Sequence, residues 1–482
     1  GTEQTGRVLA GLFDTLTTLL VFAAGLRLWG MAAGLVASAL YALAVLPIHL
    51  GHMYISDPFM VFFMTAGLLG SLLFYQTRRT LFLLVAGFCL GLAMACKLSA
   101  ASALVLPLAA IALPSPGSEG LKWKRGLGLG ALAMAAAFVG LFLGDPFAVL
   151  DAPNYLSQIG GQLAIQSGAD DRWFTRRYVG TWPVAYPWGQ LVLLGVGPMV
   201  GIAGTLGAGL VAVQAWRRRG GAEALLLLGA ATYFATIAFA EAKWVRYLLP
   251  LVPYLCLFAT ALALRLWNAA ASSRAGPILR YAVPVLLIGS ALVGALAFRA
   301  IYGVEHTRVQ ASRWIYGNVP PGSAIAIEIN DGLMPRALPG HPNPEQDYHV
   351  IWLRTLADFP SAEASAMLRD QLAQADYLVY SPVRPERTVA RMPWRYPVQN
   401  RYYNLLLSGR LGFTPVYTAT SYPSIFGLEI PDDNDWVDAS FIEYDHPPVQ
   451  VFKKERTLSR AELDTLFADA VRQPSVATRH AP

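Results

Sequence analysis

Apolar segments of membrane-spanning length follow one another from about residue 7 to residue 301, and they constrain the fold more than any other feature. A helix needs about 20 apolar residues to cross the hydrocarbon core of a bilayer. By that criterion we expect ten spans: 8–27, 31–50, 57–75, 80–95, 99–114, 126–144, 190–214, 222–240, 247–267 and 280–301. Because 80–95 and 99–114 are short, we expect these two helices to be tilted or partly buried in protein.

The sequence after residue 303 has the character of an ordinary soluble protein. The whole chain is only 14% charged, against about 25% in soluble domains, and the deficit lies before this point. We therefore predict an α-helical polytopic membrane protein with a small C-terminal α/β soluble domain. The predicted division is a transmembrane domain at 1–303, an extracytoplasmic domain at 304–473 and a disordered tail at 474–482.

Strand and helix patterns alternate in the C-terminal region, which is typical of an α/β domain. Strands are expected at 324–329, 377–380 and 449–452, and an amphipathic helix at 306–317. Ser361 is expected to cap a helix that ends at Leu372. Ser459 and Glu462 have the spacing of a capping box that opens the last helix.

Positive charge in the short loops predicts the orientation of the chain. The loops expected in the cytoplasm contain Arg27, Arg78, Arg79, Lys122, Lys124, Arg125, Arg217, Arg218, Arg219, Arg265, Arg274 and Arg280. The alternating loops hold fewer cations, so we expect residue 1 and the C-terminal domain to lie outside the cell's inner (plasma) membrane. The net charge of +6 is scattered among these loops. A nucleic-acid-binding protein would gather its cations on one face, so we expect no nucleic-acid partner.

The long outer loop, 145–189, has more pattern than a plain linker. Asp151 and Pro153 indicate the start of a helix. A run rich in charged and aromatic residues then extends from Asp170 to Tyr178. Two interpretations stay open for this stretch: a surface loop that touches lipid headgroups, or a loop that closes over a bound substrate.

Charged residues beside the apolar spans are the candidates for a functional site, because each is costly inside a membrane. Asp57 opens a span at its outer end, where it could either cap the helix or act in catalysis. Lys97 lies at the outer tip of the short helix pair, where it could snorkel to the headgroups or bind a phosphate. Lys243 and Arg246 lie three residues apart at the outer membrane level, where they would suit an anionic partner.

Two further groups have a structural alternative. Arg7 and Asp14 share one face of the first span, and Asp14 is best explained as a hydrogen-bonding group between helices. His49 and His52 precede Asp57 and could bind a metal with it, although this spacing is weak evidence. The sequence does not require a cofactor, and a bound divalent metal stays open as an alternative.

Four stretches of the membrane region resemble a known family. They are Gly6 to Ala10, Ser56-Asp57-Pro58, Gly87 to Lys97, and Arg246 to Pro250 with Pro253. Their order resembles the membrane glycosyltransferases of the protein O-mannosyltransferase and lipid A aminoarabinose transferase type, family 39 of the GT-C superfamily. The stretches 401–413, 421–433 and 444–454 resemble the C-terminal regions of bacterial relatives.

The resemblance implies an activity and a site. A sugar on a polyprenyl phosphate would be moved to a lipid, glycan or protein acceptor with inversion, and the lipid phosphate would leave. It implies that Asp57 is a catalytic acid and that the donor is contacted by Arg7, His52, Lys97, Lys243, Arg246 and Tyr247. The family's principal acid lies in a loop before the helix that matches 8–27, so we expect it upstream of Gly1.

Two other functions stay open beside this one. A non-catalytic scaffold or binding protein could keep the same fold without the chemistry. A transporter is the third interpretation, although we see no convincing repeat between the two halves of the chain.

Overall fold

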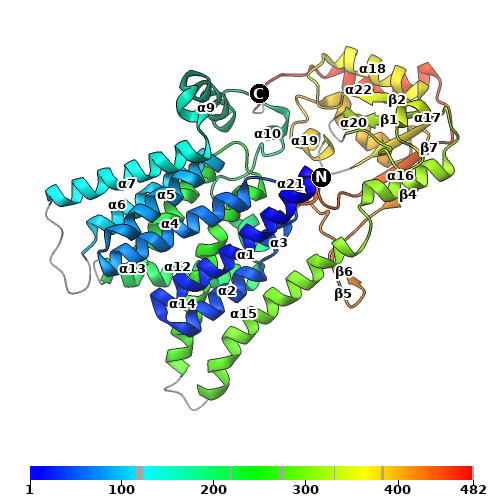
Figure 1. The fold of residues 1–482 in the computed structure, drawn as a ribbon. Helices are drawn as coiled ribbons and strands as arrows, with labels where there is room; N and C mark the ends of the chain where they lie inside the picture. The colour runs from blue at the N-terminus through cyan, green and yellow to red at the C-terminus, as the bar shows by residue number, and fades with distance from the viewer. Residues whose placement is uncertain (115–122, 218–219, 271–275, 330–331, 382–384, 480–482) are drawn as a thin grey trace. The chain divides into compact units, whose positions relative to one another are not determined.

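The computed structural model describes residues 1–114, 123–217, 220–270, 276–329, 332–381 and 385–479. Four cations used for the predicted orientation, Lys122, Arg218, Arg219 and Arg274, lie outside these ranges. The contacts divide the chain into two compact units (Figure 1). Unit 1 contains 1–163 and 182–296, and unit 2 contains 164–181 and 297–482.

Unit 1 is helical throughout the part that the structure describes. Its helices are α1 (Thr2–Trp29), α2 (Met31–Ala42), α3 (Val45–Gly51), α4 (Asp57–Thr77), α5 (Thr80–Cys96), η1 (Leu98–Leu104), α6 (Val105–Ala112), α7 (Trp123–Gly144), α8 (Phe147–Leu150), α9 (Ala152–Ser167), α11 (Ala185–Gln190), η2 (Leu191–Gly195), α12 (Pro198–Arg217), α13 (Ala222–Ala238), η3 (Val245–Leu251), α14 (Val252–Ala270) and α15 (Gly276–Arg299). Helices α9 and α15 each run across the boundary into unit 2.

The helices confirm the fold class and the order of the apolar segments. Among the described residues, six helices are long and apolar enough to cross a membrane, and three more helical stretches are apolar but shorter. The pair α2 and α3 is bent by 56° at its break. Together these match the ten expected segments. The short pair 80–95 and 99–114 is found as α5, then η1 running into α6.

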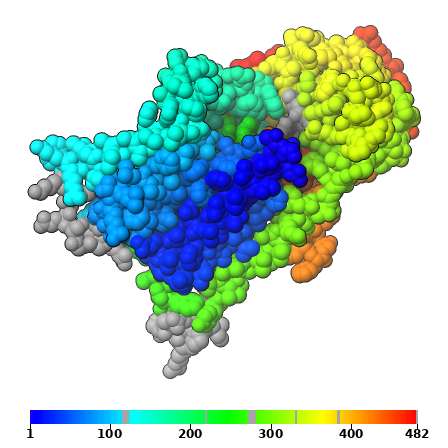
Figure 2. Space-filling model, in the orientation of Figure 1, coloured from blue at the N-terminus to red at the C-terminus, as the bar shows by residue number. Residues whose placement is uncertain are grey.

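The outward faces of the long helices are apolar. Val8 and Leu19 on α1 and Leu127 and Phe138 on α7 are all more than half exposed. Helices α1, α4, α5 and α7 form the face of unit 1 seen in Figure 2. Exposed apolar side chains on long helices are what a lipid environment requires, so the chain is a multi-pass membrane protein.

Close backbone contacts hold α5 and α7 together. A Cβ atom on Gly87 would lie 2.3 Å from the Ala133 carbonyl oxygen, and one on Gly91 would lie 2.0 Å from the Ala137 oxygen. Only glycine permits such an approach, as in other membrane helix pairs. The glycines of the Gly87–Lys97 motif are therefore explained by packing, and this packing also positions the end of α5, where Lys97 follows.

Unit 2 is a mixed α/β domain around a five-stranded sheet, which confirms the predicted C-terminal fold class (Figure 1). The strand order is β2-β1-β3-β7-β4; β1 pairs in parallel with β2 and β3, and β7 pairs antiparallel with β3 and β4. A two-stranded hairpin lies apart from this sheet. The strands are β1 (Ala324–Glu328), β2 (His349–Leu353), β3 (Tyr377–Tyr380), β4 (Phe413–Ala419), β5 (Ser424–Ile425), β6 (Leu428–Glu429) and β7 (Val449–Lys454).

Helices cover both faces of the sheet because its strand residues alternate between two apolar cores. Ala326 joins a core with residues of α18, α20 and α22, whereas Ile325 and Ile327 join a core with residues of α16. The helices and helical turns of unit 2 are η4 (Ala300–Gly303), α10 (Trp173–Arg176), α16 (Thr307–Asn318), α17 (Pro344–Asp347), α18 (Ser361–Gln374), α19 (Pro385–Arg391), α20 (Pro397–Leu407), α21 (Ala439–Ile442) and α22 (Arg460–Arg472).

Two capping predictions have opposite outcomes. The capping box of Ser459 and Glu462 is present in both directions, as predicted. Ser361 was expected to cap α18, and this is wrong, because its hydroxyl donates instead to the Gln473 carbonyl oxygen at 2.6 Å. A tertiary partner has replaced the local one.

The segment 164–181 of the outer loop belongs to unit 2. The helix predicted from Asp151 and Pro153 is found as α9. The charged and aromatic stretch that follows is packed against unit 2, because Val179 and Trp173 join its apolar core. The Arg177 guanidinium lies 2.7 Å from the Glu443 carboxylate, and both side chains are buried. Neither open interpretation of this stretch anticipated that it packs into the C-terminal unit.

A network of ions fixes the same segment. The Arg395 guanidinium donates to Asp171 at 2.6 Å and to Asp358 at 2.6 and 2.7 Å. Arg176 also reaches both carboxylates, at 3.1–3.4 Å. Arg479 donates to Asp171 and to Thr175. The structure thus differs from the predicted disordered tail over residues 474–479, because this ion contact holds them; 480–482 lie outside the described residues.

Candidate active site

The candidate site lies where α4 begins, α5 ends and η3 passes between them. Helix α4 packs against α5 and against η3. Asp57 is the first residue of α4, Lys97 follows the last residue of α5, and Arg246 and Tyr247 belong to η3. Helix packing therefore brings together residues that are up to 190 positions apart in the sequence.

Asp57 and Lys97 form an ion pair. The Lys97 Nζ lies 3.0 Å from the Asp57 Oδ1, and the side chains are 27% and 3% exposed, respectively. Asp57 also occupies the first turn of α4, where a carboxylate stabilises a helix, but no side-chain cap is formed there. The pairing with Lys97 was not predicted, because each residue was interpreted alone.

Tyr247 connects the two cations of the site. The Lys97 Nζ lies 3.8 Å from the centre of the Tyr247 ring, and the Arg246 guanidinium carbon lies 5.6 Å from the same centre. The guanidinium also lies over the Trp244 ring, at 4.3 Å. Aromatic faces attract cations at these distances. The Tyr247 carbonyl accepts a hydrogen bond from the Tyr233 hydroxyl at 3.0 Å, which ties η3 to α13.

Arg246 retains hydrogen-bonding capacity in this arrangement. Its Nε is buried, and no acceptor within the described ranges reaches it. A buried donor without an acceptor costs free energy, so an anion at this point would be stabilised. Lys243, three residues earlier, is also buried and engaged with its surroundings.

The remaining predicted residues lie in other environments. Arg7 pairs with Glu3 on the exposed side of α1, at 2.5 Å. His52 Nδ1 lies 2.6 Å from the Ile48 carbonyl oxygen. Asp14 accepts a hydrogen bond from Tyr41 of α2 at 2.7 Å, which confirms its interpretation as a hydrogen-bonding group between helices.

No group of three His, Cys, Asp or Glu side chains within the described ranges is arranged to hold a metal ion. His49 is buried and belongs to α3, one turn before His52. The metal alternative raised by His49, His52 and Asp57 therefore gains no support from this geometry.

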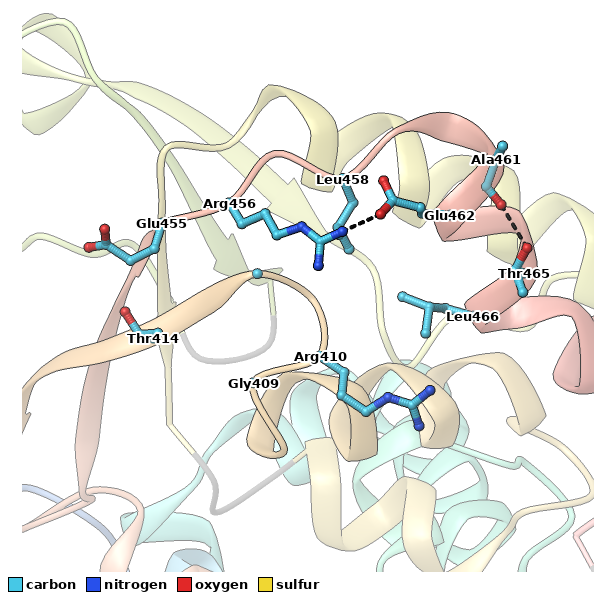
Figure 3. Close-up of a pocket in the computed structure, with 11 residues that line it drawn as sticks. Gly409, Arg410, Thr414, Glu455, Arg456, Leu458, Ala461, Glu462, Thr465 and Leu466 are labelled. Atoms are coloured by element: carbon cyan, nitrogen blue, oxygen red, sulfur yellow. Dashed lines mark hydrogen bonds and ion pairs between the residues drawn. The ribbon is translucent and has the colours of Figure 1, made fainter.

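A separate hollow lies in unit 2 and contains none of the predicted site residues. It has a volume of about 650 Å³ and lies between the start of α22 and the turn before β4 (Figure 3). Arg456 at its wall pairs with Glu462, as the dashed line in Figure 3 shows. Because both side chains of this pair are well exposed, the hollow is a solvated groove and has no buried binding group of the kind found around Arg246.

Comparison with known proteins identifies the N-terminal part of the chain. Residues 1–142 match the family described as dolichyl-phosphate-mannose-protein mannosyltransferase. This stretch includes α1, α4, α5 and both members of the Asp57–Lys97 pair. The match confirms the resemblance to membrane glycosyltransferases that the motifs indicated. Among the curated proteins, none matches the chain.

Several solved structures are similar to the chain at low sequence identity. An oligosaccharyltransferase of Archaeoglobus fulgidus with a tethered acceptor peptide is 14% identical, with 82% of this chain and 61% of that chain covered and a TM-score of 0.44. ArnT of Cupriavidus metallidurans bound to undecaprenyl phosphate is 13% identical, with 99% and 85% covered and a TM-score of 0.37. The arabinofuranosyltransferase AftD of Mycobacteria is 15% identical, with 92% and 33% covered and a TM-score of 0.34. The chain thus spans less than two thirds of the length of the Archaeoglobus protein.

Proposed function

We propose that this chain is a membrane glycosyltransferase that moves a sugar from a polyprenyl-phosphate donor to an extracytoplasmic lipid, glycan or protein acceptor, with inversion at the sugar. The family matched by residues 1–142 is named for a donor of this kind. The observation that carries the proposal is the placement of Lys97 and Arg246 around one ring, Tyr247, with Asp57 beside the lysine.

The two cations suit the departure of a lipid phosphate. Charge accumulates on the phosphate oxygens as the bond to the sugar breaks, and fixed cations in a water-poor site stabilise that charge. Arg246 would donate its free Nε and one terminal nitrogen to two phosphate oxygens. Lys97 would add a point charge, moving away from Asp57 toward the phosphate.

Asp57 supplies a carboxylate within the same site. Without donor, its charge is balanced by Lys97. When Lys97 turns to the phosphate, the carboxylate becomes available to the acceptor side of the reaction. The resemblance matches Asp57 to the second acid of the family, and we give it that role here. A correctly placed carboxylate would accept the hydroxyl proton of the acceptor or orient that hydroxyl.

Binding of undecaprenyl phosphate tests the phosphate site without knowledge of the sugar, because the lipid phosphate is common to all such donors. The protein in nanodiscs is titrated with this lipid by native mass spectrometry, for the wild type, Lys97→Ala and Arg246→Ala. We expect each substitution to weaken binding at least about tenfold, as loss of a charged hydrogen bond predicts.

A matched control is Lys124→Ala. Gly87 faces Ala133 and Gly91 faces Ala137, so α5 and α7 run parallel, and Lys124 at the start of α7 lies at the opposite end from Lys97. Unchanged binding in both Lys97→Ala and Arg246→Ala would remove the proposed phosphate site. Binding without sugar transfer from any lipid-linked donor would favour the scaffold, and solute flux in proteoliposomes would favour the transporter.

The orientation of the site is part of the proposal. The distribution of cations among the short loops supports an orientation in which the Asp57 end of α4 faces the outside of the inner membrane, and we propose the same side for unit 2. In a variant with Cys89, Cys96 and Cys256 replaced by alanine, a cysteine introduced at Ala169 should react with an impermeant maleimide from outside intact cells. One introduced at Lys124 should react only after the cells are opened. The reverse pattern would invert the proposed topology.

A further inference from the structure

The β5–β6 hairpin of unit 2 exposes an unusual amount of apolar surface. Phe426 at its tip is 97% exposed, and Leu428 is 72% exposed. Ile430 is also exposed and continues the hairpin, since its amide donates to the Pro423 carbonyl oxygen at 2.8 Å. Figure 2 shows the hairpin as an orange projection from the surface. A soluble domain seldom leaves such a cluster in water, so the cluster marks a contact surface.

The backbone of the hairpin is built to hold this cluster in one place. Phe426 and Gly427 both have positive φ, 50° and 82°, as in the tight turns that join two short strands. The Tyr422 hydroxyl donates to the Asp433 carboxylate at 2.7 Å and closes the base of the hairpin. This hydrogen bond therefore holds the base of the hairpin in place below the exposed tip.

The apolar residues lie on one side of the hairpin. Successive side chains in a strand point to opposite faces. Leu428 and Ile430 therefore share a face, and Glu429 between them takes the other. One face can enter an apolar phase while the carboxylate stays in water.

The hairpin contacts residues of unit 2 that directly follow a membrane-spanning helix in the chain. Strand β5 packs against η4, which directly follows Arg299, the last residue of α15. Val304, just after η4, is 53% exposed. Tyr444 is half exposed, and its carbonyl oxygen lies 3.3 Å from the His306 Nε2. Exposed apolar residues of unit 2 thus lie within a few residues of the end of the span, at Val304, and beside η4, on the hairpin.

We infer that the β5–β6 hairpin inserts into the outer boundary of the bilayer and anchors unit 2 there. Phe426 and Leu428 would enter the region between headgroups and acyl chains, and Tyr444 would occupy the headgroup level, where such rings concentrate. A bilayer is the occupant that matches an apolar surface starting at the exit of a span.

The charge around the hairpin specifies the lipid chemistry. Glu429, Asp433 and Asp435 flank the apolar residues, and the side chain of Asp433 is bonded to a neutral group, the Tyr422 hydroxyl. Acidic side chains are repelled by an anionic leaflet. Insertion is therefore driven by apolar contact, and it should be stronger in zwitterionic than in anionic lipid.

The test uses the whole chain in phosphatidylcholine nanodiscs. On the background without native cysteines, Phe426→Cys is labelled with the environment-sensitive dye NBD. Leu407→Cys is the matched control, because Leu407 is half exposed on unit 2 but belongs to α20. We expect emission from position 426 to shift to the blue and to be lost when the lipids carry nitroxides on their acyl chains. Emission from position 407 should be quenched by aqueous iodide instead.

Two results would overturn the inference. Iodide quenching at 426 equal to that at 407 would show a hairpin in water. Protection at 426 from both iodide and lipid nitroxides would show that a protein surface, such as a second copy of the chain, covers it. Replacing half of the phosphatidylcholine by phosphatidylglycerol should lower the nitroxide quenching at 426, and an increase would contradict the apolar mode of insertion.

Discussion

The ammonium of Lys97 lies 3.0 Å from the carboxylate of Asp57, so the end of α5 and the start of α4 are joined by opposite charges in a largely buried place. Removing one partner of a buried ion pair leaves the other charge uncompensated and lowers stability, whereas removing both charges can leave the stability nearly unchanged. This asymmetry separates the structural role of the pair from its proposed role in binding phosphate.

The first prediction uses that asymmetry. Asp57→Asn alone and Lys97→Met alone should each destabilise the protein, toward the lower end of about 3–5 kcal/mol because Lys97 keeps 27% exposure. The double variant should regain most of the lost thermal stability in detergent, yet bind undecaprenyl phosphate at least about tenfold more weakly than the wild type. Regained binding in the double variant would show that neither charge serves the donor.

A second prediction concerns the contact between α5 and α7. Gly91→Ala places a Cβ 2.0 Å from the Ala137 carbonyl oxygen, so the helices must separate and Tm should fall. Gly128→Ala in α7 is the control, because no atom lies within 4 Å of its added Cβ. The control should match or slightly exceed the wild type, since alanine favours a helix over glycine by about 1 kcal/mol. Equal Tm values for the two variants would contradict the close packing.

The third prediction tests the buried pair that fixes the outer loop. Arg177→Met leaves the Glu443 carboxylate buried without its cation, at a cost of about 3–5 kcal/mol. Protease sensitivity of the 164–181 segment should rise accordingly. Adding Glu443→Gln removes the stranded charge and should restore part of the protection. If the single variant resists protease as the wild type does, the segment is held by its apolar contacts alone.

The fourth prediction is a dependence on pH in unit 2. Burial alone would raise the pKa of Asp358, but hydrogen bonding and charge from Arg395 and Arg176 outweigh it and hold the pKa below its ordinary value. The pKa of Asp171 is lowered in the same way, against burial. A lowered folded-state pKa gives stability that is present above the unfolded value of about 3.9 and is lost as pH falls through the folded value.

Asp358→Asn should therefore lower Tm at pH 7. The Tm difference from the wild type should begin to shrink below about pH 4, where the unfolded carboxylate takes up its proton, and should vanish only below the lowered pKa of the native carboxylate. Asp370→Asn, on the exposed side of α18, is the control and should leave Tm unchanged at each pH. A Tm difference for Asp358→Asn that stays constant down to pH 3 would show that the charge of Asp358 is not the source of the lost stability.

Sequence alone determined which region lies in lipid and which in water, and it singled out the candidate site residues. Hydropathy is a local property, so the ten apolar segments and the α/β character of the C-terminal region could be predicted. The cost of charge in lipid singled out Asp57, Lys97 and Arg246 individually, and Asp14 as a bonding group between helices.

Only the tertiary structure decided which of these residues meet. The pairing of Asp57 with Lys97, and the sharing of the Tyr247 ring by Lys97 and Arg246, depend on how α4, α5 and η3 pack. The same holds for Arg177, whose partner Glu443 lies 266 residues away. Periodicity reports which face of a helix is apolar but not which distant chain covers it, so a charge and its partner can be recognised in sequence separately and joined only in the fold.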